Sequence, residues 1–348
     1  MTVVITPVDV VALGAVVRIA LPDDAPEALV ESIRTVWRGA IVEGRTPDRT
    51  IDLIPGDEDQ VLETLSMRVT LEALDHRRGG LIMFHAAGVA DERGRVAAFV
   101  GPSGRGKTTL SRALSQEYGY VSDETIGVDV DLRIHPYRKP LSVVRPALPK
   151  KQISPEDAGM KGLPSAALRL SALALLERDP GLDAVRVEHV PFLDAVPDLV
   201  PQLSYLADLE RPLQELAELC DAVGGVVRLS YPDASTVAAT VPALLDSSPQ
   251  DRAWQPAPPA VDGGPFDTSP SRDAILVDER LALLADGRVQ VLDGIAPVIW
   301  LSARAGLDLD GIVAAVVEAF GAPDGADARE LVGAAADELV AAGVLTAR

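Results

Sequence analysis

The chain is poor in cysteine and in basic side chains, and each shortage narrows the functions open to it. Cys220 is the only cysteine among 348 residues, so an internal disulfide and a thiolate metal cluster are excluded. Lysine and arginine number 32 against 52 aspartates and glutamates, which gives a formal net charge of −20. Such an acidic chain is unsuited to a broad contact with the phosphate backbone of DNA or RNA, whereas a basic partner peptide is compatible with it.

Long apolar runs are also missing. No uninterrupted apolar stretch approaches the roughly 20 residues that span a bilayer, and the first residues lack the pattern of a signal peptide. We therefore expect no membrane contact and a cytoplasmic protein. Apolar residues nevertheless make up 47% of the chain, which predicts a globular protein of two or three domains.

A phosphate-binding loop is the clearest motif. Residues 101–108, GPSGRGKT, fit the pattern G-x-x-x-x-G-K-[ST], between an apolar run at 96–100 that predicts a strand and helical spacing at 108–118. Backbone N–H groups of such a loop and the helix N-terminus hold phosphate oxygens. Lys107 is expected on the β and γ phosphates and Thr108 in the Mg²⁺ shell. The predicted nucleotide-binding residues are Gly101, Ser103, Gly104, Arg105, Gly106, Lys107, Thr108 and Thr109.

Two acids follow the predicted helix closely. A strand predicted at 120–122 ends at Asp123 and Glu124, and Asp123 lies 16 residues after Lys107. The chain lacks the LSGGQ signature of transport ATPases and the N-K-x-D motif of GTPases. Neighbouring acids suit a phosphotransferase, because one can hold Mg²⁺ while the other accepts a proton from an attacking hydroxyl. A solvated acidic turn is the alternative.

A histidine lies upstream in the same predicted sheet. His85 belongs to FHAAGVA, residues 84–90, and a hairpin predicted at 91–94 joins this stretch to the strand before the loop. His85 would then lie within reach of Asp123. Most isolated histidines are structural, so the proposed role depends on the surrounding pattern.

This pattern of histidine strand, phosphate-binding loop and acidic pair resembles the bacterial HPr kinase/phosphorylase family over about residues 70–145. The resemblance implies ATP and Mg²⁺ as cofactors. It also implies that His85 and Asp123 handle the proton of the target hydroxyl. Thr108 and Glu124 would then hold the metal. If the two acids exchange roles, Asp123 would be the metal ligand. The family has a second aspartate where this chain has Glu124, and the longer side chain leaves open which acid does which job.

After the acidic pair the chain departs from HPr kinases. Their further glutamate and glycine-rich signature is replaced by residues 134–164, which resemble the divergent HPr-kinase-like proteins of peptide natural-product clusters. Some of those proteins phosphorylate a serine of a precursor peptide. Arg138, with Lys139 and Arg145 as further candidates, would stabilise charge on the transferred phosphoryl group, an effect on the order of 10³-fold for an arginine finger. Surface charge is the alternative for each.

The remaining chain predicts a second domain. Residues 247–271 contain 12 proline, glycine or serine residues among 25 and show no periodicity, so we expect a linker between residues 1–246, with a nucleotide core at about 80–145, and residues 272–348. In the first part, strands are expected near 3–5 and 15–19 and a helix near 26–37. In the tail, short apolar strands at 274–277, 281–284 and 288–292, with a turn at Asp286–Gly287, precede three amphipathic helices.

This tail resembles PqqD-like domains, small winged-helix modules of peptide biosynthesis. In that family a leader peptide docks as an added strand on a sheet edge and against the last helix, which here would use the edge at 274–277 or 288–292. A winged-helix DNA reader is the alternative, which the acidic tail disfavours.

The two resemblances together predict an α/β chain in which a P-loop kinase domain of the HPr-kinase type is joined to a small winged-helix domain. The expected function is ATP-dependent phosphorylation of a serine or threonine in a ribosomally made precursor peptide. A metabolic or regulatory kinase and a non-catalytic, nucleotide-gated peptide adaptor are the alternatives. A homo-oligomer remains open.

Overall fold

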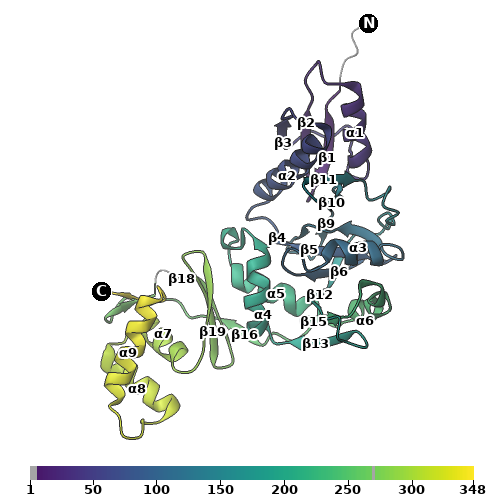
Figure 1. Cartoon of the computed structure of the whole chain (residues 1–348). Coiled ribbons are helices and arrows are strands. Elements are labelled where there is room, and N and C mark those ends of the chain that lie inside the picture. The colour runs from purple at the N-terminus through teal and green to yellow at the C-terminus, as the bar shows by residue number, and fades with distance from the viewer. Residues whose placement is uncertain (1–5, 269–270) are drawn as a thin grey trace. The chain divides into compact units, whose positions relative to one another are not determined.

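The computed structural model describes residues 6–268 and 271–348 as a mixed α/β protein (Figure 1). Its contacts divide the chain into two compact units. The first unit extends to Pro191 and includes residues 198–209 and 222–250, and the second contains residues 192–197, 210–221 and 251–348. The strand expected at residues 3–5 lies outside the described residues. Within residues 6–268 and 271–348, no helix is both long and apolar enough to cross a membrane.

A six-stranded mixed sheet forms the centre of the first unit. Its order is β13–β15–β12–β6–β5–β7, where β12 is parallel to β6 and β15 and the other neighbours are antiparallel. The strands are β5 (Ala86–Ala90), β6 (Arg95–Val100), β7 (Gly119–Ser122), β12 (Arg169–Arg178), β13 (Arg186–Val190) and β15 (Val226–Tyr231). The strands expected at 96–100 and 120–122 are confirmed. The sheet also extends well beyond residue 145, where the nucleotide core was expected to end.

Strand direction brings the chemically important residues to one edge of this sheet. β6 and β7 both run antiparallel to β5, which lies between them. The residues that follow β6 and β7 therefore lie beside the residue that precedes β5. These are the phosphate-binding loop, the acidic pair and His85, respectively. The end of β15 reaches the same edge, because β15 and β6 are both parallel to β12.

One face of the sheet is covered by α3 (Lys107–Leu114) and α6 (Val241–Leu245). Leu110 and Leu114 of α3 are fully buried, and they share a cluster with Phe99 and with alternate residues of the neighbouring strands. Burial of each such side chain contributes about 1.5–3 kcal/mol. This packing fixes the first turn of α3 against the end of β6.

The first unit also contains a smaller sheet, a hairpin and several short turns. A second, antiparallel sheet has the order β14–β4–β8–β9, with strands β4 (Ile82–Phe84), β8 (Ile126–Val128), β9 (Ile134–His135) and β14 (Leu203–Ser204). A hairpin follows, formed by β10 (Leu141–Arg145) and β11 (Leu148–Ile153). Short 3₁₀ turns are η1 (Val200–Gln202), η2 (Leu206–Asp208), η3 (Ala234–Thr236) and η4 (Ala238–Thr240).

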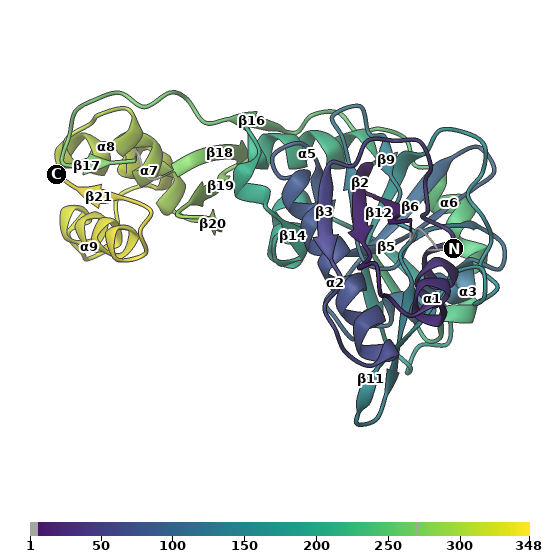
Figure 2. The same cartoon turned by 90° about the horizontal axis from the view of Figure 1, so that it is seen from above.

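The N-terminal part of the first unit is a three-stranded sheet with two helices. Its strands are β1 (Val8–Ala12), β2 (Ala15–Ala20) and β3 (Arg49–Asp52), and its helices are α1 (Glu27–Trp37) and α2 (Glu58–His76). The strand at 15–19 and the helix at 26–37 are thereby confirmed. Figure 2 shows α2 running beside β3, with which it makes contact. Tyr137, from the segment after β9, is fully buried in the core of this part.

The second unit contains the expected strands and helices of the tail. Its sheet has the antiparallel order β16–β18–β19–β20, and a separate strand pair is formed by β17 and β21. The strands are β16 (Trp254–Pro256), β17 (Phe266–Asp267), β18 (Ser271–Val277), β19 (Arg280–Ala285), β20 (Arg288–Leu292) and β21 (Thr346–Ala347). The helices are α7 (Ala296–Arg304), α8 (Leu309–Phe320) and α9 (Ala328–Ala341), and the fully buried Trp300 lies in their core.

The stretch 247–271 differs from the expected linker, because it supplies β16 and β17. Trp254 pairs with Val277 in the sheet, and its indole N–H donates to the Asp221 carboxylate at 2.8 Å. Strands of two or three residues leave no periodicity in a proline-rich sequence, so they were missed. β16 also occupies the outer edge of β18, which rules out residues 274–277 as an exposed edge.

The second unit also contains a helix from the middle of the chain. Residues 210–221, nearly all of α5 (Pro212–Ala222), belong to it, as do the first residues of α4 (Phe192–Leu199). The buried carboxylate of Asp273 in β18 accepts hydrogen bonds from the N–H groups of Leu213 and Gln214, at 2.8 and 3.2 Å, and from the Gln214 amide at 2.8 Å. The tail therefore caps a helix that the sequence assigned to the kinase domain, so the expected boundary at residue 246 is not a clean division.

Replacing Asp273 by alanine should lower the free energy of unfolding by about 1–2 kcal/mol, because loss of a helix cap typically costs 0.5–2 kcal/mol. Urea denaturation followed by circular dichroism measures the change. Asp273→Asn is the matched control, since its amide oxygen can still accept from the backbone, and it should lose less stability. Equal stability of all three proteins would contradict the capping role.

Candidate active site

The predicted phosphate-binding loop lies between β6 and α3. Gly104 and Gly106 take φ values of +82° and +93°, where a side chain would strain the backbone. A Cβ atom at Gly104 would meet nothing within 4 Å. Gly106 is the N-cap of α3 and supplies no side-chain cap, so the N–H groups of the first helical turn are available to an anion.

Lys107 lies under this loop rather than in solvent. It is only 6% exposed, and its ammonium donates to the carbonyls of Gly101 at 2.5 Å and Pro102 at 3.1 Å. Burial lowers the pKa of Lys107, while the Glu124 and Asp123 carboxylates act in the opposite direction. The cation therefore lies between the loop and the acidic pair, where it can compensate phosphate charge.

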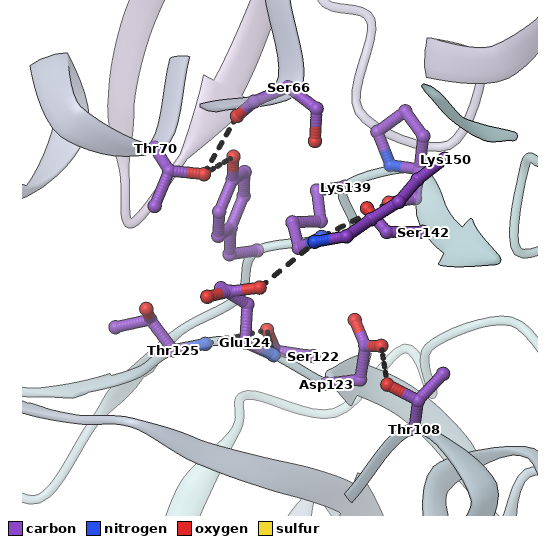
Figure 3. A network of polar contacts seen from close by, with 12 residues as sticks. Ser66, Thr70, Thr108, Ser122, Asp123, Glu124, Thr125, Lys139, Ser142 and Lys150 are labelled. Atoms are coloured by element: carbon purple, nitrogen blue, oxygen red, sulfur yellow. Dashed lines mark hydrogen bonds and ion pairs between the residues drawn. The ribbon is translucent and has the colours of Figure 1, made fainter. Parts of the chain in front are cut away.

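Asp123 is a buried carboxylate with a partner on each oxygen. Thr108 donates to Oδ2 at 2.7 Å and the Tyr120 hydroxyl donates to Oδ1 at 2.8 Å, while the residue is 6% exposed. Burial raises the pKa of Tyr120, so its hydroxyl remains a donor. Figure 3 shows the carboxylate turned toward Thr108. Asp123 is thereby held next to the loop hydroxyl that the motif assigns to a metal.

Glu124 points the other way, toward His85 and Lys139 (Figure 3 labels Lys139). Its Oε1 lies 3.8 Å from His85 Nε2 and its Oε2 lies 3.4 Å from the Lys139 ammonium. The Glu124 side chain is 38% exposed, in contrast to the buried Asp123. Glu124 is therefore the acid of the pair that a second substrate could reach.

His85 is the single residue between β4 and β5. Its backbone N–H donates to the carbonyl of Gln202 at 2.7 Å. Burial lowers the pKa of its imidazole, with the Lys107 ammonium as the next cause, while Glu124, Gln202 and Asp123 act in the opposite direction. The ring is therefore mainly neutral at pH 7 and has a nitrogen that can accept a proton.

The structure brings His85, Lys107, Thr108, Asp123 and Glu124 to the same sheet edge, but the pairing within this set differs from the expected one. Asp123 contacts the loop hydroxyl and Glu124 faces the histidine, whereas the family pattern implied the reverse. The reason is a bend that follows β7, in which the Ser122 hydroxyl accepts from the N–H groups of Glu124 and Thr125 at 3.1 and 3.2 Å. Ser103, Gly104, Arg105 and Thr109 are exposed around the loop.

Arg138, expected to stabilise charge on the transferred phosphoryl group, is held by contacts within the protein. Its buried guanidinium donates to the Tyr120 carbonyl at 3.0 Å and to Glu156 at 2.5 Å, and it lies 5.6 Å from the Tyr120 ring. Arg138 therefore supports the tyrosine that holds Asp123. Arg145 pairs with Asp59 of α2 at 2.7 Å, in the N-terminal part of the unit.

Three contributors to the site were not identified from the sequence: Tyr120, Gln202 and Tyr231. The Tyr231 hydroxyl at the end of β15 donates to the carbonyl of Arg105 in the loop at 3.4 Å. Both Gln202 and Tyr231 come from parts of the chain far beyond the motifs. The apolar run before Tyr231 was the one available signal, because it predicts another strand whose end could meet the loop.

The oxygen atoms beside the loop fit a magnesium ion and a nucleotide. Thr108 and Asp123 offer hard oxygen ligands, and Mg²⁺ is usually held by one or two protein ligands together with phosphates and water. Among the described residues, no group of three or more histidine, cysteine or acidic side chains is arranged to hold a metal by itself. A metal shared with a phosphate agrees with this donor set.

In the described part of the chain, the four-stranded sheet of the second unit ends in β16 on one side and in β20 on the other. Of the two edges expected to bind a leader, only the one at β20 has no neighbouring strand. Gln290 of β20 donates its side-chain amide to the carbonyl of Ala342, just after α9, at 3.2 Å. The edge at 288–292 therefore adjoins the last helix, as one of the two expected docking edges requires.

Compared with known proteins, the sequence matches no family model and no curated protein.

Proposed function

We propose that the chain is an ATP-dependent kinase that phosphorylates a hydroxyl of a peptide. The observation that carries the proposal is the gathering of Lys107, the Thr108–Asp123 pair and the Glu124–His85 pair at one sheet edge. A binding protein for nucleotides needs the loop and its lysine only. An exposed acid that can accept the proton of the acceptor hydroxyl is what a phosphotransferase needs in addition, and Glu124 is such an acid.

In the proposed reaction the loop N–H groups and Lys107 would bind the nucleotide phosphates, and Thr108 and Asp123 would hold Mg²⁺. The metal would neutralise phosphate charge. Glu124 accepts the proton of the acceptor hydroxyl while the oxygen of that hydroxyl forms the new bond to the γ phosphorus. The bond from that phosphorus to the β–γ bridging oxygen breaks, and ADP leaves with the electron pair. His85 Nε2 lies 3.8 Å from Glu124 Oε1, so it would take the proton onward through a bridging water.

This assignment exchanges the roles that the family resemblance implied for the two acids. It is supported by the two donors that already hold Asp123 and by the exposure of Glu124. A carboxylate that accepts from a loop hydroxyl is suited to a metal, while a general base must be accessible to the acceptor.

The features of the second unit are the reason for proposing a peptide as the acceptor. Its three consecutive strands and three helices support a winged-helix module of the PqqD-like kind, and the open edge of β20 beside α9 is suited to an added strand. We infer that a leader segment of the precursor binds there. A metabolic or regulatory kinase and a nucleotide-gated adaptor remain the competing functions.

The proposal is tested by incubating the full chain with γ-labelled ATP, Mg²⁺ and a precursor peptide encoded beside its gene. We expect label on one serine or threonine of the peptide, and poor labelling of the same peptide without its leader. ATP binding without transfer to any acceptor would favour the adaptor. Transfer only to a small metabolite would favour a metabolic kinase.

Proline at residues 289 and 291 should weaken leader binding at least about tenfold, the effect of one lost net hydrogen bond of about 1–1.5 kcal/mol. Arg288 and Ala285 close the two-residue turn as a hydrogen-bonded pair, so the N–H groups of Val289 and Val291 point away from β19. Val289→Ala and Val291→Ala keep these donors and are the matched controls. Calorimetric titration with a leader peptide measures the change, and equal affinities for proline and alanine variants would exclude this edge.

A further inference from the structure

Lys139 lies in a segment that is fixed on both sides. The segment between β9 and β10 contains Tyr137, whose hydroxyl is 2.7 Å from that of Thr70 in α2 and whose N–H donates to the Val121 carbonyl at 3.2 Å. Arg138 is held by Tyr120 and Glu156. The backbone that carries Lys139 is therefore tied both to the N-terminal core and to β7.

The Lys139 side chain points into the candidate active site. The residue is 3% exposed, and its ammonium lies 3.3 Å from the Pro140 carbonyl and 3.4 Å from Glu124 Oε2. A buried ammonium requires a compensating partner, and the Glu124 carboxylate is the anionic one here. Since Oε1 of the same carboxylate faces His85, Glu124 has a cation on one oxygen and a neutral imidazole near the other.

We propose that Lys139 is a positioning residue for phosphoryl transfer, which fixes the Glu124 carboxylate so that Oε1 is presented to the acceptor hydroxyl. This inference rests on the proposed function, in which Glu124 is the base. Glutamate has three side-chain torsions, so an unpaired Glu124 would be distributed over several rotamers. Lys139 selects one of these rotamers. The Thr70–Tyr137 contact anchors the segment that carries Lys139 to α2.

The alternative for a buried lysine at this place is direct contact with the transferred phosphoryl group. The two roles differ in one measurable way. A residue that acts through Glu124 has nothing to act on once the carboxylate is removed, whereas a residue that contacts phosphate keeps its effect. A double-mutant cycle therefore separates them.

The experiment measures kcat and KM of the full chain for Lys139→Met, Lys139→Arg, Glu124→Gln and the Lys139→Met/Glu124→Gln pair. We expect Lys139→Met to lower kcat by about 10–100-fold, as misplacement of a catalytic group by about 1 Å can do, with KM for ATP almost unchanged. Lys139→Arg should recover part of the loss. In the Glu124→Gln background, Lys139→Met should cause little further loss.

Three outcomes would overturn the inference. These are an unchanged kcat in Lys139→Met, losses that multiply in the double variant, and a raised KM for ATP as the main effect. Circular dichroism and thermal unfolding of each variant separate misfolding from catalysis, and Lys139→Arg retains the charge if the methionine variant fails to fold. A wild-type chain that transfers phosphate to nothing would instead sink the proposed function, and this inference with it.

Discussion

Lys107→Ala is expected to abolish phosphoryl transfer and to weaken ATP binding by about 10–100-fold. The estimate follows from the loss of one hydrogen bond to a charged group, about 1.5–3 kcal/mol, at 1.4 kcal/mol for each factor of ten. The loss of transfer is larger than the loss of binding, because negative charge develops on the leaving β–γ bridging oxygen as its bond to the γ phosphorus breaks. Equilibrium titration with a fluorescent ATP analogue and a transfer assay measure the two effects separately.

The control for this variant is Lys151→Ala, which removes an exposed cation from the same acidic chain. It should leave both binding and transfer unchanged, which excludes a general effect of the net charge of −20. Turnover in Lys107→Ala at the wild-type rate would remove the assignment of the loop as the phosphate site.

Glu124→Gln should lower kcat by about 10²–10⁴-fold, the usual contribution of a general base, while ATP affinity and the Mg²⁺ requirement change little. Glutamine keeps the size of the side chain and loses the ability to accept the proton. Steady-state kinetics over a range of Mg²⁺ concentrations measure the effect.

Asp123→Asn is the matched variant, because it removes the neighbouring charge by the same chemical change. Its expected effect is a raised Mg²⁺ requirement, since Thr108 and Asp123 are the proposed ligands. If Asp123→Asn loses kcat and Glu124→Gln shifts the Mg²⁺ requirement, the roles implied by the family resemblance are correct and the exchange proposed above is wrong.

Local patterns predicted most of the elements that form the candidate site. The glycine-rich loop, its strand and its helix have short-range signals, and the apolar run before Asp123 marks β7. The partners of the two acids could not be predicted, because they depend on how the chain bends after β7 and on where the segment that carries Lys139 packs. Tyr231 and Gln202 were missed for a related reason, since strand pairing between distant parts of the chain brings Tyr231 to the loop and Gln202 to His85.

The strand β16 shows a different limit. Its three residues lie in a proline-rich stretch, and only the unpaired edge of β18 makes them a strand. Such pairing depends on the partner and not on intrinsic propensity. The same contact decides which of the two expected docking edges remains open.

The cap that Asp273 provides to α5 has a consequence for recombination. A chain with two compact units invites exchange of the tail for another one by joining sequences within the segment 247–271. Here such a chimera would inherit α5 from one parent and its capping carboxylate from the other. A functional exchange therefore needs the foreign module to carry an acceptor at the position of Asp273, or to be transplanted together with its own copy of residues 210–221. Natural variants of this architecture should accordingly change the helix and the tail together.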